Sequence, residues 1–377
     1  MCETQLLMLG NDGVLYTMHR DGTTPRAVAR GMRAISSSQA VLACVTDDGQ
    51  IVLRTHETMV PFFSSRHLGP GGQAFCAVAC GSLHVVALDA GGNVWVMGTG
   101  PGACVAARAA PRTWQPLPRD AFAGAAVSAV AAGSHHSGVI TAPHGRVYLW
   151  GVNTCGELAT PDPEDRAMEP RAVALAHPVT QLALGWHYTV LCVADAVWAC
   201  GLGNFGQLGL GKCSIVTSPE RVPRLGAVAD VSCGLTHTAV VDAAGAVWTA
   251  GRRSCMLGRA LQEVDSIFFE RVPGLDGCGA EVHVGPSVVV LATDEGRAYA
   301  WGMPRTLAVP DGHSPKSVPI TEHVVAGRRT TRRMGTAAAL AVCMGRHARL
   351  GAASAVSCLD NDVLALILEC AAVRPAP

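Results

Sequence analysis

Residues 234–251 read Gly-Leu-Thr-His-Thr-Ala-Val-Val-Asp-Ala-Ala-Gly-Ala-Val-Trp-Thr-Ala-Gly, and this stretch decides the fold. The apolar run after the histidine ends at an Asp-Ala-Ala-Gly turn, and a second apolar run follows it. Two short runs joined by such a turn are typical of a β-hairpin. Both halves of the stretch recur elsewhere in the chain, so it predicts one unit of a repeat protein.

The second half, in which a small or acidic residue precedes a branched apolar residue and an aromatic one, occurs seven times. The clear copies are at 92–98, 145–151, 196–201, 245–251 and 296–302, and two degenerate copies lie at 12–16 and 48–53. Aligned on the branched position, the copies fall at 14, 51, 94, 147, 197, 247 and 298. Most of these intervals are close to fifty residues, a period that is typical of propeller blades.

The first half, Gly-x-x-His followed by an apolar run, also recurs in register. Its copies begin at Gly81, Gly133, Gly185 and Gly234 and carry His84, His136, Tyr188 and His237. A repeat register places these histidines about one blade apart, so we expect them to be buried and bonded to the backbone of the neighbouring blade. By the same argument the repeat tryptophans Trp95, Trp198 and Trp248 are predicted to lie in the core.

Two weaker strands complete each unit, for example 220–223 followed by 227–233. Four strands in each of seven units predict an all-β, seven-bladed β-propeller, a ring that leaves few exposed sheet edges. Residues 321–327 resemble a strand that nothing suitable follows, and residues 5–9 resemble the strand that should come next. We therefore expect the ring to close by pairing these terminal strands. This gives a propeller at 1–327 and a tail at 328–377.

The closing loops of the units carry a resemblance to a known family. Gly201-Leu202-Gly203-Asn204-Phe205-Gly206-Gln207-Leu208-Gly209-Leu210-Gly211 and Gly151-Val152-Asn153-Thr154-Cys155-Gly156-Glu157-Leu158 resemble the regulator-of-chromosome-condensation repeat. The likeness covers about residues 4–327 and is strongest over 81–302, so the chain looks like a divergent member. It implies the seven-bladed propeller and, as the best-known activity of the family, nucleotide exchange on the small GTPase Ran. The connections at 99–118 and 159–175 lack the alternating pattern of the hairpin wedge used for that exchange.

The tail carries the only dense basic cluster. Its arginines are Arg328, Arg329, Arg332 and Arg333. They fit a solvated linker, a nuclear-import signal, a phosphate contact or a kinase site at Thr331. Helices are expected at 334–347 and 359–371, so that the fold ends in a short helical tail.

The second of these helices resembles the first helix of an F-box, which docks onto a Skp-type ubiquitin-ligase adaptor. The apolar residues that would make the contact are Leu359, Val363, Leu364, Ile367 and Leu368. The remainder of an F-box is absent from the sequence, so packing against the propeller is the competing interpretation.

Composition narrows the function further. The 29 basic residues balance 29 acidic ones, so nothing in the net charge indicates chromatin or a membrane as partner. The 15 cysteines are scattered without zinc-finger spacing, and we expect buried free thiols, no metal and no cofactor. No phosphate loop, nucleophile elbow or carboxylate pair stands out, and the N-terminus lacks a signal-peptide pattern. An intracellular chain that is not an enzyme, with no small-molecule substrate, is expected.

We therefore expect an interaction scaffold that binds a protein partner through the variable loops 99–118, 159–175 and 252–268. A guanine-nucleotide exchange factor for a Ran-like GTPase and a substrate-recognition subunit of a ubiquitin ligase are the alternatives. Trp186 stands in a setting that resembles the plant UV-B receptor branch of the family. The equivalent residues Ser82, Ser134, Leu235 and Pro286 are not tryptophans, which argues against light sensing.

Overall fold

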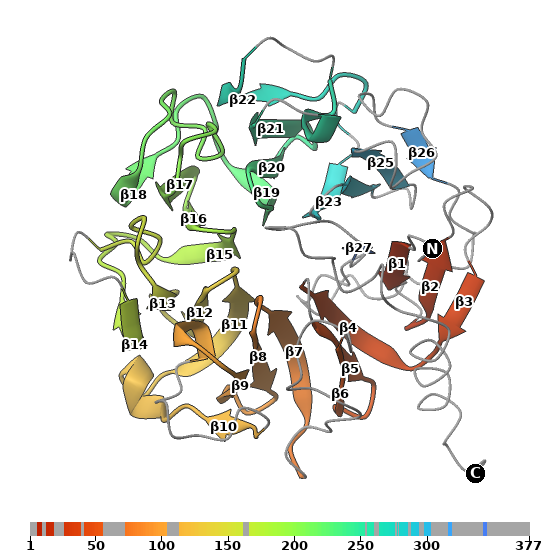
Figure 1. The fold of residues 1–377 in the computed structure, drawn as a ribbon, viewed down its shortest axis with the longest axis vertical. Coiled ribbons are helices and arrows are strands. Elements are labelled where there is room, and N and C mark those ends of the chain that lie inside the picture. Colours follow the sequence, from red (N-terminus) through yellow and green to blue (C-terminus); the bar gives the residue numbers. More distant parts are fainter. Residues whose placement is uncertain are drawn as a thin grey trace.

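The protein is a closed ring of small antiparallel sheets, seen along the ring axis in Figure 1. This computed structural model describes residues 6–9, 13–18, 26–38, 41–55, 72–103, 113–160, 166–252, 255–259, 264–275, 277, 279–285, 288–293, 298–302, 316–318 and 342–344. Within each sheet the strands follow one another from the ring axis to the rim. The chain is thus an all-β propeller.

Six sheets have four strands each. Five of them consist of four consecutive strands. The first contains β7 (Phe75–Cys80), β8 (His84–Asp89), β9 (Val94–Gly98) and β10 (Gln115–Pro116). The second contains β11 (Ala126–Ala132), β12 (His136–Ala142), β13 (Val147–Val152) and β14 (Arg166–Ala172). The third contains β15 (Val179–Leu184), β16 (Tyr188–Val193), β17 (Ala196–Gly201) and β18 (Val216–Arg221). The fourth contains β19 (Val228–Cys233), β20 (His237–Asp242), β21 (Val247–Gly251) and β22 (Ser266–Arg271). The fifth contains β23 (Gly279–Val284), β24 (Val288–Thr293), β25 (Ala298–Gly302) and β26 (Lys316–Val318). The sixth joins β27 (Val342–Met344) to β1 (Leu6–Leu9), β2 (Leu15–Met18) and β3 (Arg26–Ala29).

Among the described residues only six sheets have four strands, so the expectation of seven complete blades is wrong. The remaining sheet consists of β4 (Met32–Ser37), β5 (Val41–Thr46) and β6 (Ile51–Thr55). This short sheet contains the degenerate sequence copy at 48–53, which lacks the closing loop that leads to a fourth strand elsewhere. Among the described residues the only helical turns are 3-10 turns: η1 (Pro101–Ala103), η2 (Arg119–Phe122) and η3 (Cys255–Leu257).

A strand from the C-terminal part of the chain closes the ring, but a different one from that expected. β1 pairs in antiparallel fashion with β27, with Leu7 opposite Cys343, and residues 321–327 lie outside the described residues. β27 also falls inside 334–347, where the sequence predicted a helix, so that prediction is wrong at 342–344. Pairing both long edges of β1, with β2 and β27, is the physical gain that favours a strand here.

The sequence unit and the blade are offset by one strand. The weaker strands predicted at 220–223 and 227–233 correspond to β18 and β19, which belong to neighbouring sheets and do not pair. The Gly-x-x-His phrase instead follows the innermost strand of each sheet, and the aromatic phrase forms the third strand. Each innermost strand from β4 to β23 also carries a bulge, for example between Val127 and Ala129.

The core lies between neighbouring sheets rather than within any one of them. The second strands β8 and β16 are buried at every position, because the next sheets cover both of their faces. This explains why they read as continuous apolar runs without alternation. One inter-sheet cluster packs Val86 and Val96 against Phe122, Val139 and Trp150.

Trp150 is a good test of this packing. It is fully buried, it packs near Phe122, and its indole N–H donates to the Gly102 carbonyl of the preceding sheet at 3.0 Å. We expect Trp150→Ala to lower the free energy of unfolding by about 3–5 kcal/mol, as large-to-small changes of buried aromatics do. Urea unfolding followed by fluorescence would measure the change. Val264→Ala, at a position that is 68% exposed, is the control and should change stability by less than about 0.5 kcal/mol. Equal effects would contradict inter-sheet packing at Trp150.

Candidate functional site

The connections between strands divide the ring into two faces. Because successive strands run antiparallel, the first and third connections of a sheet leave at the same end. We call this end the loop face. Its described residues include 81–83, 133–135, 185–187 and 234–236 near the axis, and 99–103, 113–114, 153–160, 202–215, 252, 255–259 and 264–265 farther out. The opposite end, the turn face, holds the tight turns 90–93, 143–146, 194–195 and 243–246. The predicted loops 99–118, 159–175 and 252–268 therefore begin on the loop face. Their last residues lie in or just after the outer strands β10, β14 and β22.

Polar contacts on the loop face join each sheet to the next. His84 Nε2 lies 2.7 Å from Ser137 Oγ of the next sheet, and that hydroxyl donates back to the Gly102 carbonyl at 2.8 Å. His136 repeats the contact with Thr189 at 3.1 Å. At Tyr188 the phenol donates to the His237 carbonyl of the next sheet at 2.6 Å. The sequence predicted bonding to neighbouring backbone, whereas the histidines bond to neighbouring hydroxyl groups.

The glycine of the Gly-x-x-His phrase makes room for the ring of its own fourth residue. A Cβ on Gly81 would lie 2.0 Å from His84 Cε1, and one on Gly185 would lie 2.1 Å from Tyr188 Cε1. The ring therefore lies over a bare Cα, which accounts for the pairing of glycine and aromatic residue at this spacing. Gly133 contacts the ring of His136 in the same way. At Gly234 the nearest atom is instead Cγ1 of Val284 in the next sheet.

The repeat tryptophans lie at the edge of the core. Trp95, Trp198 and Trp248 are partly buried, and two of them donate to an aspartate: Trp95 to Asp89 at 3.1 Å and Trp248 to Asp242 at 2.8 Å. The wholly buried tryptophans are Trp150 and Trp301, two residues farther along the third strand in alignment. Sequence reasoning missed them because the other sheets place Met, Cys and Ala there.

Near the axis, the loop face carries a group of rings that we call the imidazole cluster: His135, Trp186 and His187. The ring centroids of His135 and His187 are 5.7 Å apart, and those of Trp186 and His187 are 5.0 Å apart. All three residues are partly exposed. Leu83, in the equivalent loop of a neighbouring sheet, is 38% exposed and is one of few large apolar side chains at the described surface.

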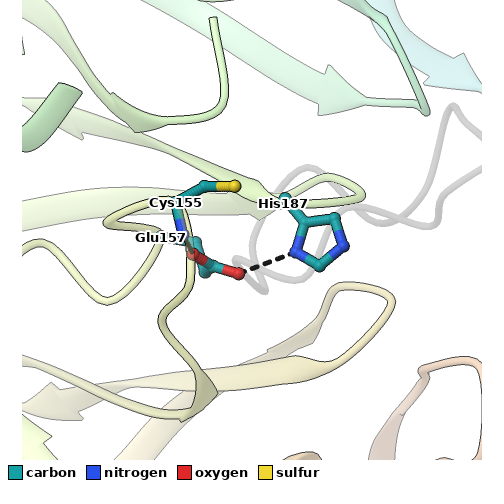
Figure 2. Close-up of side chains that lie close together, drawn as sticks. All are labelled: Cys155, Glu157 and His187. Atoms are coloured by element: carbon teal, nitrogen blue, oxygen red, sulfur yellow. Dashed lines mark hydrogen bonds and ion pairs between the residues drawn. The ribbon is translucent and has the colours of Figure 1, made fainter. Parts of the chain in front are cut away.

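A buried carboxylate lies beside this cluster. Glu157 has no exposed side-chain surface, and its Oε1 is 2.8 Å from Nδ1 of His187 (Figure 2). Its Oε2 accepts the backbone N–H of Cys155 at 2.7 Å. In the next sheet Gln207 caps the equivalent turn with a neutral amide, accepting the N–H of Phe205 at 2.9 Å. The charge at Glu157 is therefore not needed for the turn.

Cys155, Glu157 and His187 form a group that could hold a metal ion, with ligand atoms all within 4.8 Å of one another. Burial and the Glu157 carboxylate raise the pKa of the Cys155 thiol. No metal was expected from the sequence. His187 comes from a different sheet than Cys155 and Glu157, so the spacing of the three residues along the chain does not match a metal-binding motif. Elsewhere in the described chain Cys44, Cys80, Cys192 and Cys200 are buried and form no disulfide bond.

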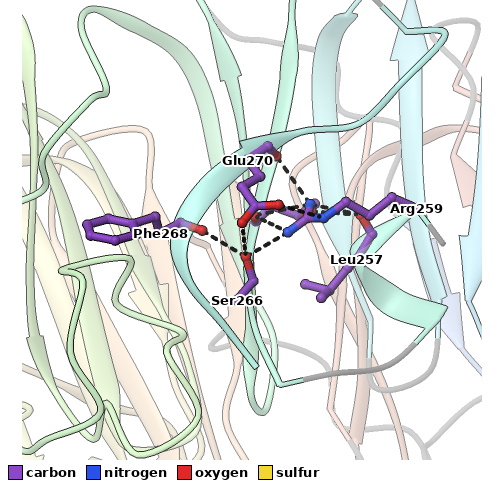
Figure 3. A network of polar contacts seen from close by, with 6 residues as sticks. Leu257, Arg259, Ser266, Phe268 and Glu270 are labelled. Carbon is purple, nitrogen blue, oxygen red and sulfur yellow. Dashed lines mark hydrogen bonds and ion pairs between the residues drawn. The ribbon is translucent and has the colours of Figure 1, made fainter. Parts of the chain in front are cut away.

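The connection at 252–265 is tied to its sheet by one buried arginine. The guanidinium of Arg259 donates to Thr249 Oγ1 at 2.6 Å and to Ser266 Oγ at 2.7 Å, and it forms an ion pair with Glu270 at 3.3 Å (Figure 3). Since Ser266 also donates to the Phe268 carbonyl at 2.9 Å, the network fixes the base of this connection. We assign Arg259 a structural role, which sequence reasoning did not identify.

The predicted tail sites lie outside the described residues. These are Arg328, Arg329, Arg332 and Arg333 of the basic cluster, and Leu359, Val363, Leu364, Ile367 and Leu368 of the F-box-like segment. Their roles stay predictions. Among the described residues, no helix has the length and apolar character needed to cross a membrane.

The buried histidines predict a pH dependence of stability. Burial lowers the pKa of His84 and of His136 to about 3, whereas a histidine in an unfolded chain titrates near 6.5. Between these pH values the unfolded chain binds more protons than the folded chain. The stabilisation that depends on these histidines is therefore fully present above about pH 6.5 and is lost as the pH falls. Burial also lowers the pKa of His283 to about 4, and it raises the pKa of Asp230 to about 7, which opposes the trend with one group against three.

We expect the melting temperature to fall between about pH 7.5 and about pH 5. The double variant His84→Gln, His136→Gln should be less stable at the higher pH, yet it should lose less on acidification. Differential scanning calorimetry at both values checks this. An equal loss in the variant would show that these two histidines do not carry the dependence.

The amino-acid sequence of this chain is similar to parts of several known proteins. Rat Alsin is 36% identical over 182 residues, which cover 45% of this chain and 11% of Alsin. The ultraviolet-B receptor UVR8 of Arabidopsis thaliana is 29% identical over 238 residues, 61% of this chain and 54% of the receptor. The human E3 ubiquitin-protein ligase HERC2 is 30% identical over 235 residues, 60% of this chain and 5% of the ligase. The chain thus spans about half or much less of these relatives.

Solved structures share the fold. Human WBSCR16 matches with a TM-score of 0.68 and 18% identity, covering 84% of this chain and 94% of that one. Prp20p of Saccharomyces cerevisiae, a protein described with its binding to Gsp1p and histones, matches with a TM-score of 0.67 and 15% identity over 85% and 87% of the chains. The family model of the regulator of chromosome condensation (RCC1) repeat matches residues 144–192 and 195–241. Residues 144–192 and 195–241 are therefore repeats of the regulator-of-chromosome-condensation type, and the chain is similar to proteins that carry such repeats.

Proposed function

We propose that this protein is a non-enzymatic interaction scaffold that binds a protein partner on the loop face of its propeller. The observation that carries this proposal is the segregation of its connections. The described parts of the connections between third and fourth strands, such as 99–103, 153–160 and 202–215, share one face with the inner loops. The turn face carries the tight hairpin turns and the links between neighbouring sheets, such as 117–125. Variable connections held by a rigid scaffold are the usual carriers of binding specificity.

The centre of the loop face supplies the kind of side chains that anchor protein interfaces. Trp186 is partly exposed beside the imidazole of His187, and Leu83 is 38% exposed in the equivalent loop of another sheet. Aromatic and apolar anchors in the middle of a patch carry most of the binding energy in protein complexes. Polar loops around them would form the rim. A formal net charge of zero fits a partner recognised by shape rather than by long-range attraction.

Backbone bonds between neighbouring sheets support the rigidity of this centre. The N–H of Ser82 donates to the Ser134 carbonyl at 3.0 Å, and the N–H of Ser134 donates to the Gly185 carbonyl at 3.2 Å. The inner loops of three sheets are thus linked directly to one another. A surface ordered in this way loses little conformational entropy when it binds, which favours affinity.

Matched substitutions on the two faces of one sheet test the proposal. Leu83→Arg places a charge on the loop face, and Ala90→Arg places the same charge at an exposed turn-face position of the same sheet. Affinity purification from native cells with the full chain, followed by quantitative mass spectrometry, would identify partners. We expect Leu83→Arg and Trp186→Ala to lower recovery of a specific partner at least about tenfold, the loss typical of an interface anchor. Ala90→Arg should leave recovery unchanged. Equal losses from both faces would contradict the proposal.

Nucleotide exchange is the alternative with support from the comparisons, because Prp20p shares the fold and binds Gsp1p. The scaffold proposal predicts that micromolar full-length protein leaves the rate of GDP release from a Ran-like GTPase unchanged. Release of a fluorescent GDP analogue, with and without the protein, measures this. Acceleration that is lost in Leu83→Arg and kept in Ala90→Arg would replace the scaffold proposal with the exchange factor.

The ligase-subunit alternative rests on residues 359–368, which lie outside the described residues, and it stays a prediction. HERC2 shows that a ubiquitin ligase can contain sequence similar to this chain, but the likeness covers 5% of that protein. A chromatin partner, for which Prp20p is the precedent through histones, and an intracellular location also stay predictions.

A further inference from the structure

Three residues on the loop face differ together from their counterparts in the next sheet. Cys155, Glu157 and His187 stand where the next unit has Phe205, Gln207 and Thr236. Each of the replacing side chains carries a donor atom that transition metals bind: a thiol sulfur, a carboxylate oxygen and an imidazole nitrogen. The backbone is otherwise conserved between the two turns, since Glu157 and Gln207 both accept an N–H two residues earlier and both offer their carbonyls to a neighbouring threonine at 2.7 Å.

Glu157 is a buried acidic side chain at a position where a neutral one suffices. Its side chain is 0% exposed, and the neutral Gln207 caps the equivalent turn of the next sheet. Its oxygens face the backbone N–H of Cys155 and Nδ1 of His187. A metal ion held between the three side chains would add a positive charge beside this buried acid.

The geometry fits a metal ion. The three donor atoms lie within 4.8 Å of one another, and Figure 2 shows Cys155 and Glu157 on one turn with the ring of His187 facing the carboxylate. Bond lengths of about 2.0–2.3 Å to zinc place tetrahedral ligands roughly 3.5 Å apart. Rotations that move the donor atoms by about an ångström would therefore complete the site, and Cys155 and His187 are both accessible enough to leave a position for water.

We propose that Cys155, Glu157 and His187 form a zinc site with one open coordination position. The mixed sulfur, nitrogen and oxygen set is suited to Zn²⁺, and oxygen-loving ions such as Mg²⁺ or Ca²⁺ do not select a thiolate. Because Cys155 and Glu157 follow β13 and His187 precedes β16, the ion links the loops of two neighbouring sheets. It also fixes His187 within the imidazole cluster. Binding releases the thiol proton to solvent.

Zinc titration of the full chain tests this site. All proteins carry Cys213→Ser, which removes the exposed thiol among the described residues. The test variant copies the next unit through Cys155→Phe, Glu157→Gln and His187→Thr, and the conservative variant is Cys155→Ser. After stripping by a chelator, we expect the parent to bind one more equivalent of Zn²⁺ than the test variant. Loss of a residue that only hydrogen-bonds to a metal ligand costs about 10- to 100-fold in metal affinity. Cys155 is a direct ligand in this proposal, so Cys155→Ser should weaken Zn²⁺ binding by at least about 100-fold.

Cobalt provides a readout that a structural role of these residues would not give. Co²⁺ added to the stripped parent should produce a thiolate-to-metal charge-transfer band and intense visible bands of tetrahedral cobalt, and Cys155→Ser should abolish the charge-transfer band. Thermal melting of stripped proteins controls for folding, and Zn²⁺ should raise the melting temperature of the parent alone. Equal Zn²⁺ stoichiometry in parent and test variant, or a charge-transfer band that survives Cys155→Ser, would overturn the proposal.

Discussion

A propeller sheet cannot bury both of its faces by itself, and the structure of this protein follows from that constraint. The second strands β8 and β16 are buried at every position because neighbouring sheets cover them from both sides. Large side chains such as Trp150 then fill the space between sheets and bond across it. Since each sheet depends on the next, the ring must close, and β27 closes it by pairing with β1.

The polar contacts that link the sheets obey the same repeat. In three sheets the ring that begins the second strand, that of His84, His136 or Tyr188, lies over the glycine three residues earlier and contacts a hydroxyl or carbonyl group of the next sheet. This arrangement holds the inner loops at fixed positions on one face, while the connections farther out are free to differ in length and sequence. This division into a rigid centre and variable surroundings supports the proposal that the loop face binds a partner.

Departures from the repeat carry the most information about function in such a scaffold. A buried glutamate where the neighbouring unit has glutamine adds charge without improving the turn that both residues cap. Arg259 is a different kind of departure: its guanidinium contacts Thr249, Ser266 and Glu270 of its own sheet, so it stabilises a connection. Glu157 instead faces His187, which comes from the neighbouring sheet.

The repeat, the propeller class and the likeness to the regulator-of-chromosome-condensation repeat follow from the sequence alone, because glycine, histidine and branched residues recur at a spacing that local hairpins and strands impose. The candidate loops stay a prediction. The tertiary structure was needed to show that one sheet has three strands among the described residues, that β27 pairs with β1 to close the ring, and that Trp150 is wholly buried while Trp95 is not. The approach of His187 to Glu157 belongs to this second group. Such features depend on contacts between residues about thirty or more positions apart, which no local pattern encodes.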